Sequence, residues 1–304
     1  MNSETNPATQ PSSSTEANSS FSRRGFLGRN TLAASGLMSF GILTNARRAY
    51  GDDHADKGQY SKEIDEGLAY FKKLADDQMP LIVGLKDAIA GGDLAKAKDA
   101  YVACRPHYEQ IETYAASFEE TDAKIDARPY GYDDGTTAED FVSVHKIEHL
   151  LFGEGDLAPA LPFAEQLIET CEQLKKDLNT RDAFWASINF DGMIGLANEI
   201  SSKKISSEEE TWSDQSLLIF WNNWLGIQSQ IKPYFGALSG KDEKLVSNIE
   251  AALTQCFGTV EEYHDSGVFT PYSKVGMSKR SGMVAASNAL RDSVTAAREA
   301  LGVA

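Results

Sequence analysis

The sequence predicts an all-α protein built from two helical bundles. From Tyr60 onward, apolar residues recur with the 3.6-residue period of a helix, and almost no segment shows the alternation of a strand. Glycine and proline residues fall between the periodic runs, where helices end. A short polar break at 179–182 separates the runs into two groups. We therefore expect a first bundle at 52–180 and a second at 181–304.

The first bundle is predicted to contain four helices. They cover 60–90, 93–118, a stretch from Thr136 or Thr137 to about 153, and 159–178. Asp93 is the expected N-cap of the second helix, and Thr136 or Thr137 that of the third. The segment 119–136 is predicted to be a long irregular connection, and connections of that length usually carry function.

The second bundle is predicted to repeat this pattern. Its helices are expected at 183–201, 208–235, 242–263 and 279–301. Several aromatic side chains follow one helical face of the second of these segments, a pattern typical of a hydrophobic core.

His145 and Glu148 lie inside a stripe of large apolar residues. If 141–152 is helical, both side chains lie on a face whose other members are apolar. These members are Phe141, Val144, Leu151 and Phe152. A buried imidazole and carboxylate without a hydrogen bond, an opposite charge or a metal would cost roughly several kcal/mol. Two interpretations follow: a pair on a wet helix surface, or a pair that shares a metal ion.

The N-terminal segment is predicted to be an export signal. Ser22-Arg-Arg-Gly-Phe-Leu27 resembles a twin-arginine motif, and an apolar run at 32–43 follows it. The run is too short to span a bilayer of ~30 Å. A small-x-small site near Gly51 places the expected mature start at Asp52, so 1–51 is the signal peptide and the mature chain is expected in the periplasm.

The chain is strongly acidic. Its formal net charge is −16, and removing 1–51 takes away five Arg and two Glu, which leaves −19. Such a surface repels phosphate backbones and anionic lipids, so we expect no nucleic-acid partner, whereas cations are attracted. No segment after the leader is long and apolar enough for membrane insertion. Cys104, Cys171 and Cys256 suggest neither a disulfide framework nor a thiolate metal site.

Three blocks of sequence resemble the imelysin-like family, specifically its EfeO and EfeM iron-uptake branch. The blocks are Ala100-Tyr-x-x-x-Arg105-Pro-x-Tyr108-Glu-x-Ile-Glu112, Asp122-x-x-Ile-Asp126-x-Arg128 and His145-x-Ile-Glu148. Weaker similarity continues through the Lys-Ile-Ser-x-Glu-Glu-Glu segment and the 263–272 connection, so the resemblance covers nearly all of the mature chain. It implies a fold of two helical bundles related as a pseudo-repeat. The chain is most similar to the shorter EfeM form, which lacks a cupredoxin-like domain.

The resemblance also implies a metal site. Its ligands would be Glu109, Glu112, Asp126, His145 and Glu148, with Arg128 and Tyr108 beside them. Four carboxylates and an imidazole without sulfur form a hard donor set that suits iron, as Fe2+ or Fe3+, while Zn2+ or Mn2+ is an alternative.

The implied function is periplasmic iron binding and delivery to an inner-membrane permease of the EfeUOB type, with a periplasmic haem peroxidase-like protein as a further partner. One alternative is an imelysin-like metallopeptidase. No H-E-x-x-H motif occurs, however, because Lys146 stands where the general base would lie between His145 and His149. A second alternative is a metal-free helical interaction module, in which Glu109 and Glu112 would lie on a solvated face.

Overall fold

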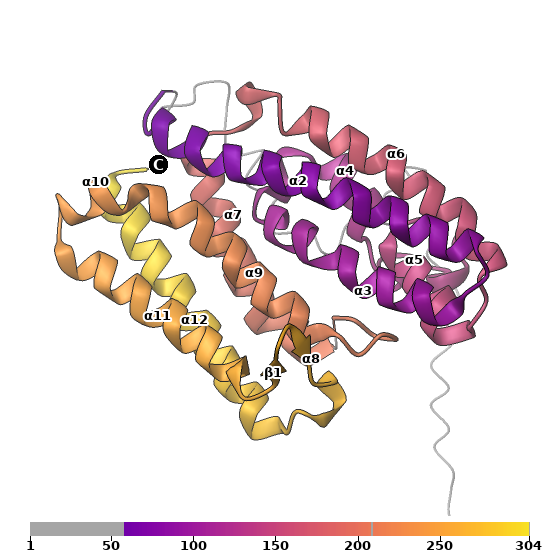
Figure 1. The fold of residues 1–304 in the computed structure, drawn as a ribbon. Coiled ribbons are helices and arrows are strands. Elements are labelled where there is room, and N and C mark those ends of the chain that lie inside the picture. Colours follow the sequence, from indigo (N-terminus) through magenta and orange to yellow (C-terminus); the bar gives the residue numbers. More distant parts are fainter. Residues whose placement is uncertain (1–57, 208, 304) are drawn as a thin grey trace, which may run out of the picture. The chain divides into compact units, whose positions relative to one another are not determined.

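The computed structural model describes residues 58–207 and 209–303, and these residues form an all-α fold, as predicted. The helices are α2 (Ser61–Ala90), α3 (Leu94–Ile111), α4 (Glu119–Asp126), α5 (Val144–Glu148), α6 (Leu161–Asp177), α7 (Ala186–Glu199), α8 (Ile205–Ser207), α9 (Ser216–Ile231), α10 (Phe235–Ser239), α11 (Glu243–Glu261) and α12 (Met277–Leu301) (Figure 1). The predicted signal peptide at 1–51 lies outside the described residues.

The first two helices follow the predicted pattern. Helix α2 buries Ile64, Leu68 and Phe71 at helical spacing. Asp93 caps α3, because its side chain accepts a hydrogen bond from the backbone N–H of Lys96 at 3.1 Å. The expected helix at 93–118 ends earlier than predicted, since a 3-10 helix continues α3 at Glu112–Ser117.

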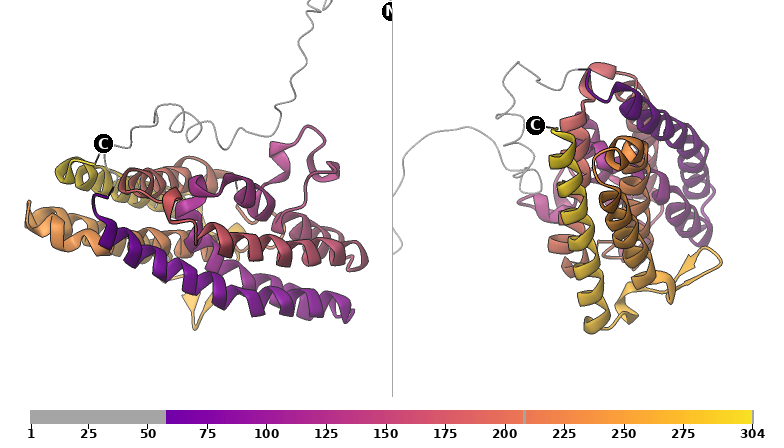
Figure 2. Two further views of the ribbon diagram at one scale, coloured as in Figure 1. Left: turned by 90° about the horizontal axis from the view of Figure 1, so that it is seen from above. Right: turned by 90° about the vertical axis from the view of Figure 1, so that its left-hand side faces the viewer.

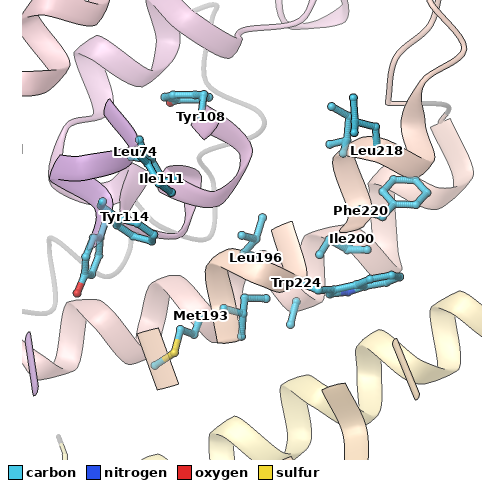
Figure 3. Packing of buried hydrophobic residues seen from close by; sticks show 14 of the residues in the cluster. Leu74, Tyr108, Ile111, Tyr114, Met193, Leu196, Ile200, Leu218, Phe220 and Trp224 are labelled. Atoms are coloured by element: carbon cyan, nitrogen blue, oxygen red, sulfur yellow. The ribbon is translucent and has the colours of Figure 1, made fainter. Parts of the chain in front are cut away.

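Helices from both halves of the chain pack together. Helix α2 lies along α3 and α6, α12 lies along α11 and α7, and α3 contacts α9 (Figure 1). Gly226 of α9 makes one of these close approaches possible, because a Cβ atom there would lie 2.4 Å from the carbonyl oxygen of Gln110. Buried side chains of the first half, such as Tyr108, and of the second, such as Trp224, belong to one hydrophobic cluster (Figure 3). The division into two bundles near residue 180 stays a prediction.

Two predictions for the region before His145 are wrong. The segment 119–126 is helical rather than irregular, because its Ile125 and the preceding Phe118 are buried and its acidic first turn favours the helix N-terminus. The cap of the next helix is Ser143 rather than Thr136 or Thr137, since Ser143 Oγ accepts the backbone N–H of His145 at 3.2 Å. The intervening chain forms only short 3-10 turns.

Two π-helical segments extend helices of the fold. One, His149–Glu154, continues α5, and the other, Ile200–Lys204, continues α7. A π-helical turn shifts the register of the side chains that follow it. The expected helix start at 208–210 is also wrong, because Glu209–Gln215 is not helical and α9 begins at Ser216.

The only strands among the described residues are β1 (His264–Asp265) and β2 (Val268–Phe269). They pair antiparallel as a small hairpin that projects from the helices (Figure 2). Among residues 58–207 and 209–303, no helix is both long and apolar enough to cross a membrane.

Candidate metal centre

A cluster of buried ionic side chains lies where α3, α4, α5 and the segments around α8 meet. Its carboxylates are Glu109, Glu112, Asp126, Glu148, Glu209 and Glu210. Its cationic partners are Arg105, Arg128 and Lys204, and His145 lies among them. Six carboxylates therefore face three permanent cations and one imidazole, so the cluster retains negative charge when all carboxyl groups are ionised.

The imidazole of His145 has a carboxylate at each nitrogen. Its Nδ1 lies 2.9 Å from Oε2 of Glu148, and its Nε2 lies 3.4 Å from Oδ1 of Asp126. The Nε2 atom is buried and has no hydrogen-bond partner of good geometry among the described residues. Burial and Arg128 lower the pKa of His145, but the two carboxylates outweigh them and raise it above its ordinary value.

Glu148 is fixed by the non-helical segment before α9. Its Oε1 accepts the backbone N–H groups of Trp212 and Ser213, both at 2.8 Å. Burial would raise the pKa of Glu148, but His145 and these two N–H groups lower it below its ordinary value. Because the backbone N–H groups occupy Oε1, the other oxygen of Glu148 remains directed at the imidazole.

Glu210 lies next to this pair and completes a compact set of donors. Ligand atoms of His145, Glu148 and Glu210 all lie within 4.8 Å of one another, and the three residues are buried. Burial and repulsion from the Glu148 charge raise the pKa of Glu210 above its ordinary value. A proton or a metal ion at this position would therefore relieve the repulsion between the two carboxylates.

Glu210 is held by three neighbours. Tyr101 donates to its Oε2 at 2.9 Å, and Ser213 Oγ donates to the same atom at 2.6 Å. Arg105 Nε donates to Oε1 at 2.9 Å. These contacts orient the carboxylate toward His145 and Glu148.

Asp126 forms the opposite side of the imidazole. Arg105 Nη2 donates to its Oδ1 at 3.0 Å, and Arg128 Nη1 donates to its Oδ2 at 2.8 Å. Burial would raise the pKa of Asp126, but Arg128, His145 and Arg105 lower it well below its ordinary value. Asp126 is thus an ionised carboxylate that can orient His145, in the manner of carboxylates behind metal-bound imidazoles.

Glu109 near the end of α3 and Glu112, the first residue of the 3-10 helix that follows, contact Lys204. Lys204 Nζ lies 2.9 Å from both carboxylate oxygens of Glu112 and 4.0 Å from Oε2 of Glu109. Glu109 is fully buried, and the side chain of Glu112 is only 10% exposed. The solvated face assumed by the metal-free interaction module is therefore wrong for these two carboxylates.

The two neighbours predicted for the ligands differ in their placement. Arg128 contacts Asp126, as expected of a charge-balancing group. Tyr108, in contrast, donates its hydroxyl hydrogen to Asp122 rather than to a predicted ligand. The structure thus brings His145, Glu148 and Asp126 together directly, and it places Glu109 and Glu112 beside Lys204.

Four residues of the cluster were not predicted from the sequence. They are Arg105, Lys204, Glu209 and Glu210. Arg105 is part of the recognised block, and the other three belong to the charged segment that ends in Glu208-Glu-Glu210. A segment this rich in charged residues normally indicates a solvated surface, so the sequence did not reveal that Lys204, Glu209 and Glu210 are buried.

A cavity of about 140 Å3 borders the cluster. Glu112, Asp126 and Arg128 line its inner side, and the exposed Ser202 is among its outer lining residues. The cavity therefore connects the acidic cluster with the protein surface. Glycine and alanine residues make up much of the remaining lining.

The donor chemistry of the cluster fits a metal ion. Carboxylate oxygens and an imidazole nitrogen are hard or borderline ligands, and no cysteine takes part. Adjacent ligands of an octahedral ion lie about 3 Å apart when each is about 2.1 Å from the ion, and Nδ1 of His145 and Oε2 of Glu148 have this spacing at 2.9 Å. The three buried cysteines have raised pKa values because of burial, so they are poor thiolate ligands.

Fold and site together define a helical protein with a buried carboxylate–histidine centre, and the chain belongs to the imelysin family. The family model described as Imelysin, peptidase M75, matches residues 58–301. Among curated relatives, the "Iron uptake system component EfeO" of Escherichia coli (strain K12) is 29% identical over 275 residues, which cover 88% of this chain and 73% of the relative. The relative of the same name from Shigella boydii serotype 4 (strain Sb227) is 30% identical over 273 residues, covering 87% and 71%.

Proposed function

We propose that this protein binds iron in the periplasm and delivers it to an inner-membrane permease. The observation that carries the proposal is the compact donor set of His145, Glu148 and Glu210, whose ligand atoms lie within 4.8 Å of one another in a buried, acidic environment. The names of the EfeO relatives supply the identity of the metal.

In this proposal the ion lies on the Nδ1 side of His145. Its donors are Nδ1, Oε2 of Glu148 and the carboxylate of Glu210. Asp126, on the Nε2 side, then holds the imidazole in the tautomer that presents Nδ1 to the ion. Glu109 and Glu112 contribute negative charge, while Arg105 and Arg128 keep the carboxylates in place.

Binding of this kind requires no covalent chemistry, which suits a carrier. The ion displaces protons from His145 and Glu210, both of which have raised pKa values. Release is the reverse exchange, in which protons return to the ligands. The cavity beside Glu112 and Asp126 reaches the Nε2 side of His145, while the three donors lie outside its lining.

Elemental analysis tests the proposal. The mature protein is purified from the periplasm, stripped with a chelator, titrated with Fe2+ under anaerobic conditions and analysed for bound iron. We expect roughly one tightly bound ion per chain, with loss of binding in Glu148→Gln. A parallel assay with an unfolded protein substrate tests the peptidase alternative. Cleavage that depends on His145, or absence of iron binding, would contradict the carrier function.

Delivery to a permease needs a separate experiment. Bacteria that lack the gene for this protein are grown under iron limitation and complemented with wild type or Glu148→Gln. We expect wild type to restore uptake of labelled iron and the variant to fail at equal protein abundance. Equal uptake by the two complemented strains would show that iron transport does not depend on iron binding at Glu148.

A further inference from the structure

The non-helical segment 209–215 covers the candidate metal centre and supplies part of it. Its Glu210 is one of the three donors, and the backbone N–H groups of its Trp212 and Ser213 hold Glu148. The three donors are buried, and they lie outside the lining of the cavity of about 140 Å3. An ion held by them therefore exchanges with solution through a local opening of the structure.

Asp214 fastens this segment to the connection that follows the hairpin. Its Oδ1 accepts the backbone N–H of Ser273 at 2.8 Å, and its Oδ2 accepts the Ser273 hydroxyl hydrogen at 2.6 Å. Its carbonyl oxygen accepts the backbone N–H of Tyr272 at 3.0 Å. Asp214 directly follows Ser213, so these three hydrogen bonds fix the position of the N–H groups that hold Glu148.

The backbone conformation of Asp214 supports this role. Its φ angle of 61° lies in the left-handed region, which few residues other than glycine adopt, although Asp and Asn tolerate it better than most. In this conformation the backbone N–H of Asp214 donates to the carbonyl oxygen of Glu210 at 3.1 Å and closes the turn that presents Glu210. Unfavourable backbone conformations persist where surrounding contacts hold them, and here Ser273 provides such contacts.

Tyr272 anchors the connection to which Asp214 is bound. Its hydroxyl donates to the carbonyl oxygen of Ile205, the first residue of α8. Its ring packs edge-on against Phe220 of α9 at a centroid distance of 5.4 Å, and the guanidinium of Arg280 lies 4.0 Å from the ring centroid. Tyr272 is fully buried. Contacts other than those of Asp214 therefore hold the connection in place.

We propose that Asp214 is a positioning residue of the metal centre, which keeps segment 209–215 closed over His145 and Glu148. Asp214 binds no ion itself, and its hydrogen bonds to Ser273 determine how often the segment opens. This role rests on the proposed iron-binding function, because it concerns the ion held at His145. A partly exposed carboxylate outside the donor set thus controls the rate at which iron leaves.

Three substitutions in the full mature chain separate the hydrogen bonds of Asp214 from its backbone conformation. Asp214→Asn keeps an acceptor for Ser273 and tolerates the left-handed region, Asp214→Gly keeps the conformation alone, and Asp214→Ala keeps neither. Iron dissociation is measured as transfer of Fe2+ from the loaded protein to an excess of chelator. We expect the dissociation rate to rise at least roughly tenfold in Asp214→Ala. Asp214→Gly should also release iron faster than wild type, and Asp214→Asn should stay close to wild type.

Asp265→Ala is the matched control. Asp265 is also an exposed carboxylate that accepts a serine hydroxyl hydrogen, from Ser266 at 2.9 Å, but it lies in the hairpin. This variant should release iron at the wild-type rate. An unchanged dissociation rate in Asp214→Ala, or equal rates in Asp214→Asn and Asp214→Ala, would overturn the role of Asp214 while iron binding by wild type stands.

Hydrogen exchange supplies a readout that needs no iron. In the iron-free protein, the amides of Trp212 and Ser213 should exchange at least roughly tenfold faster in Asp214→Ala than in wild type, because the segment opens more often. Amides in the middle of α3 should keep their exchange rates. Faster exchange throughout the helices would indicate a general loss of stability and would overturn the role of Asp214.

The two readouts separate this role from the proposed function. If wild type binds no iron, the proposed function fails, and the exchange rates still show whether Asp214 keeps the segment closed. Unchanged exchange of Trp212 and Ser213 in Asp214→Ala would overturn the closure itself, whether or not wild type binds iron.

Discussion

The Nδ1 atom of His145 lies 2.9 Å from Oε2 of Glu148, although a single turn of α5 is all that connects them. The short helix suffices because contacts from elsewhere hold both side chains. Backbone N–H groups of Trp212 and Ser213 bind Glu148, and Asp126 faces the other imidazole nitrogen. The pair is therefore positioned before any ion arrives, which reduces the cost of ordering the ligands.

The first prediction concerns this pair. His145→Ala and Glu148→Gln should each weaken iron binding by roughly 100-fold or more, because each removes a donor from a small set. Each should also remove the iron-induced rise in Tm, measured by calorimetry with and without Fe2+. Since Glu148 accepts two backbone hydrogen bonds, we expect Glu148→Gln to lower the free energy of unfolding of the iron-free protein by about 1–3 kcal/mol.

His264→Ala serves as the control for both variants. His264 lies in the hairpin, where its ring stacks on Phe269 at a centroid distance of 4.4 Å. This variant should keep the iron-induced shift. A strong loss of stability in His145→Ala combined with an unchanged iron-induced shift would show that the pair serves the fold alone.

The second prediction concerns Glu210. Burial and the Glu148 charge raise the pKa of Glu210, so Glu210→Gln removes a charge that Glu148 repels. We expect the variant to keep the Tm of the iron-free protein within a few degrees and to lose at least roughly tenfold in iron affinity, measured by competition with a chelator. An unchanged iron affinity would show that Glu210 is not a ligand. The ion would then have to lie nearer to Asp126.

A third prediction tests the charge balance around Tyr108. Burial and the Asp126 charge raise the pKa of Asp122 well above its ordinary value, although the Tyr108 hydrogen bond lowers it. The folded protein therefore holds this proton to a higher pH than the unfolded chain. The stability contributed by Asp122 is full below its unfolded pKa and decreases as the pH rises toward the folded pKa.

Asp122→Asn should consequently raise the Tm at neutral pH by roughly 2–5 °C, because the amide carries no charge and still accepts the Tyr108 hydrogen. The gain should shrink below about pH 4, where the carboxyl group is protonated in both states. Glu120→Gln on the exposed face of α4 is the control and should have little effect. A lower Tm for Asp122→Asn at neutral pH would contradict the expected cost of ionising the buried carboxyl group of Asp122.

Helical periodicity was sufficient to predict the all-α class and the first helices, because local apolar spacing determines which face of α2 is buried. Helical periodicity failed where tertiary contacts determine whether a segment is helical and where a helix begins. The segment 119–126 carries too few apolar residues to stand out, yet Ile125 and Asp126 are buried against the rest of the fold. Likewise, several residues before α5 can serve as caps, and Ser143 is held in the capping position by the hydrogen bond that its hydroxyl donates to the carbonyl oxygen of Ala127.

The candidate site shows the same limit. The blocks around Glu109, Asp126 and His145 led to residues that do meet in space. Lys204 and Glu210, however, lie about a hundred residues from their respective partners, Glu112 and Arg105. Neither spacing nor composition connects them, since a charged run is equally compatible with a solvated loop.

The fourth prediction concerns export. If Arg23 and Arg24 form a twin-arginine signal, their replacement by lysine should leave precursor in the cytoplasm, because recognition depends on the arginine pair rather than on charge alone. Fractionation followed by immunoblotting of both compartments measures the outcome. Replacing Arg47 and Arg48 by lysine is the matched control and should be processed normally. Normal processing of the Arg23→Lys/Arg24→Lys variant would exclude this route.

The last prediction concerns the pH dependence of iron binding. The pKa of His145 is raised by Asp126 and Glu148, against the effect of burial, and the pKa of Glu210 is raised by burial and Glu148. In the iron-free protein both groups therefore hold protons to a higher pH than usual, and these protons must leave when the ion binds. Affinity should fall as the pH is lowered through the raised pKa of His145, and it should fall further as the carboxylates take up protons.

Calorimetric titration with Fe2+ in two buffers of different ionisation enthalpy measures the protons released, and we expect about one per ion near neutral pH. His145→Ala should release fewer protons and bind more weakly, whereas His264→Ala should match wild type. An affinity that stays constant between neutral and mildly acidic pH would mean that His145 and Glu210 do not bind the ion.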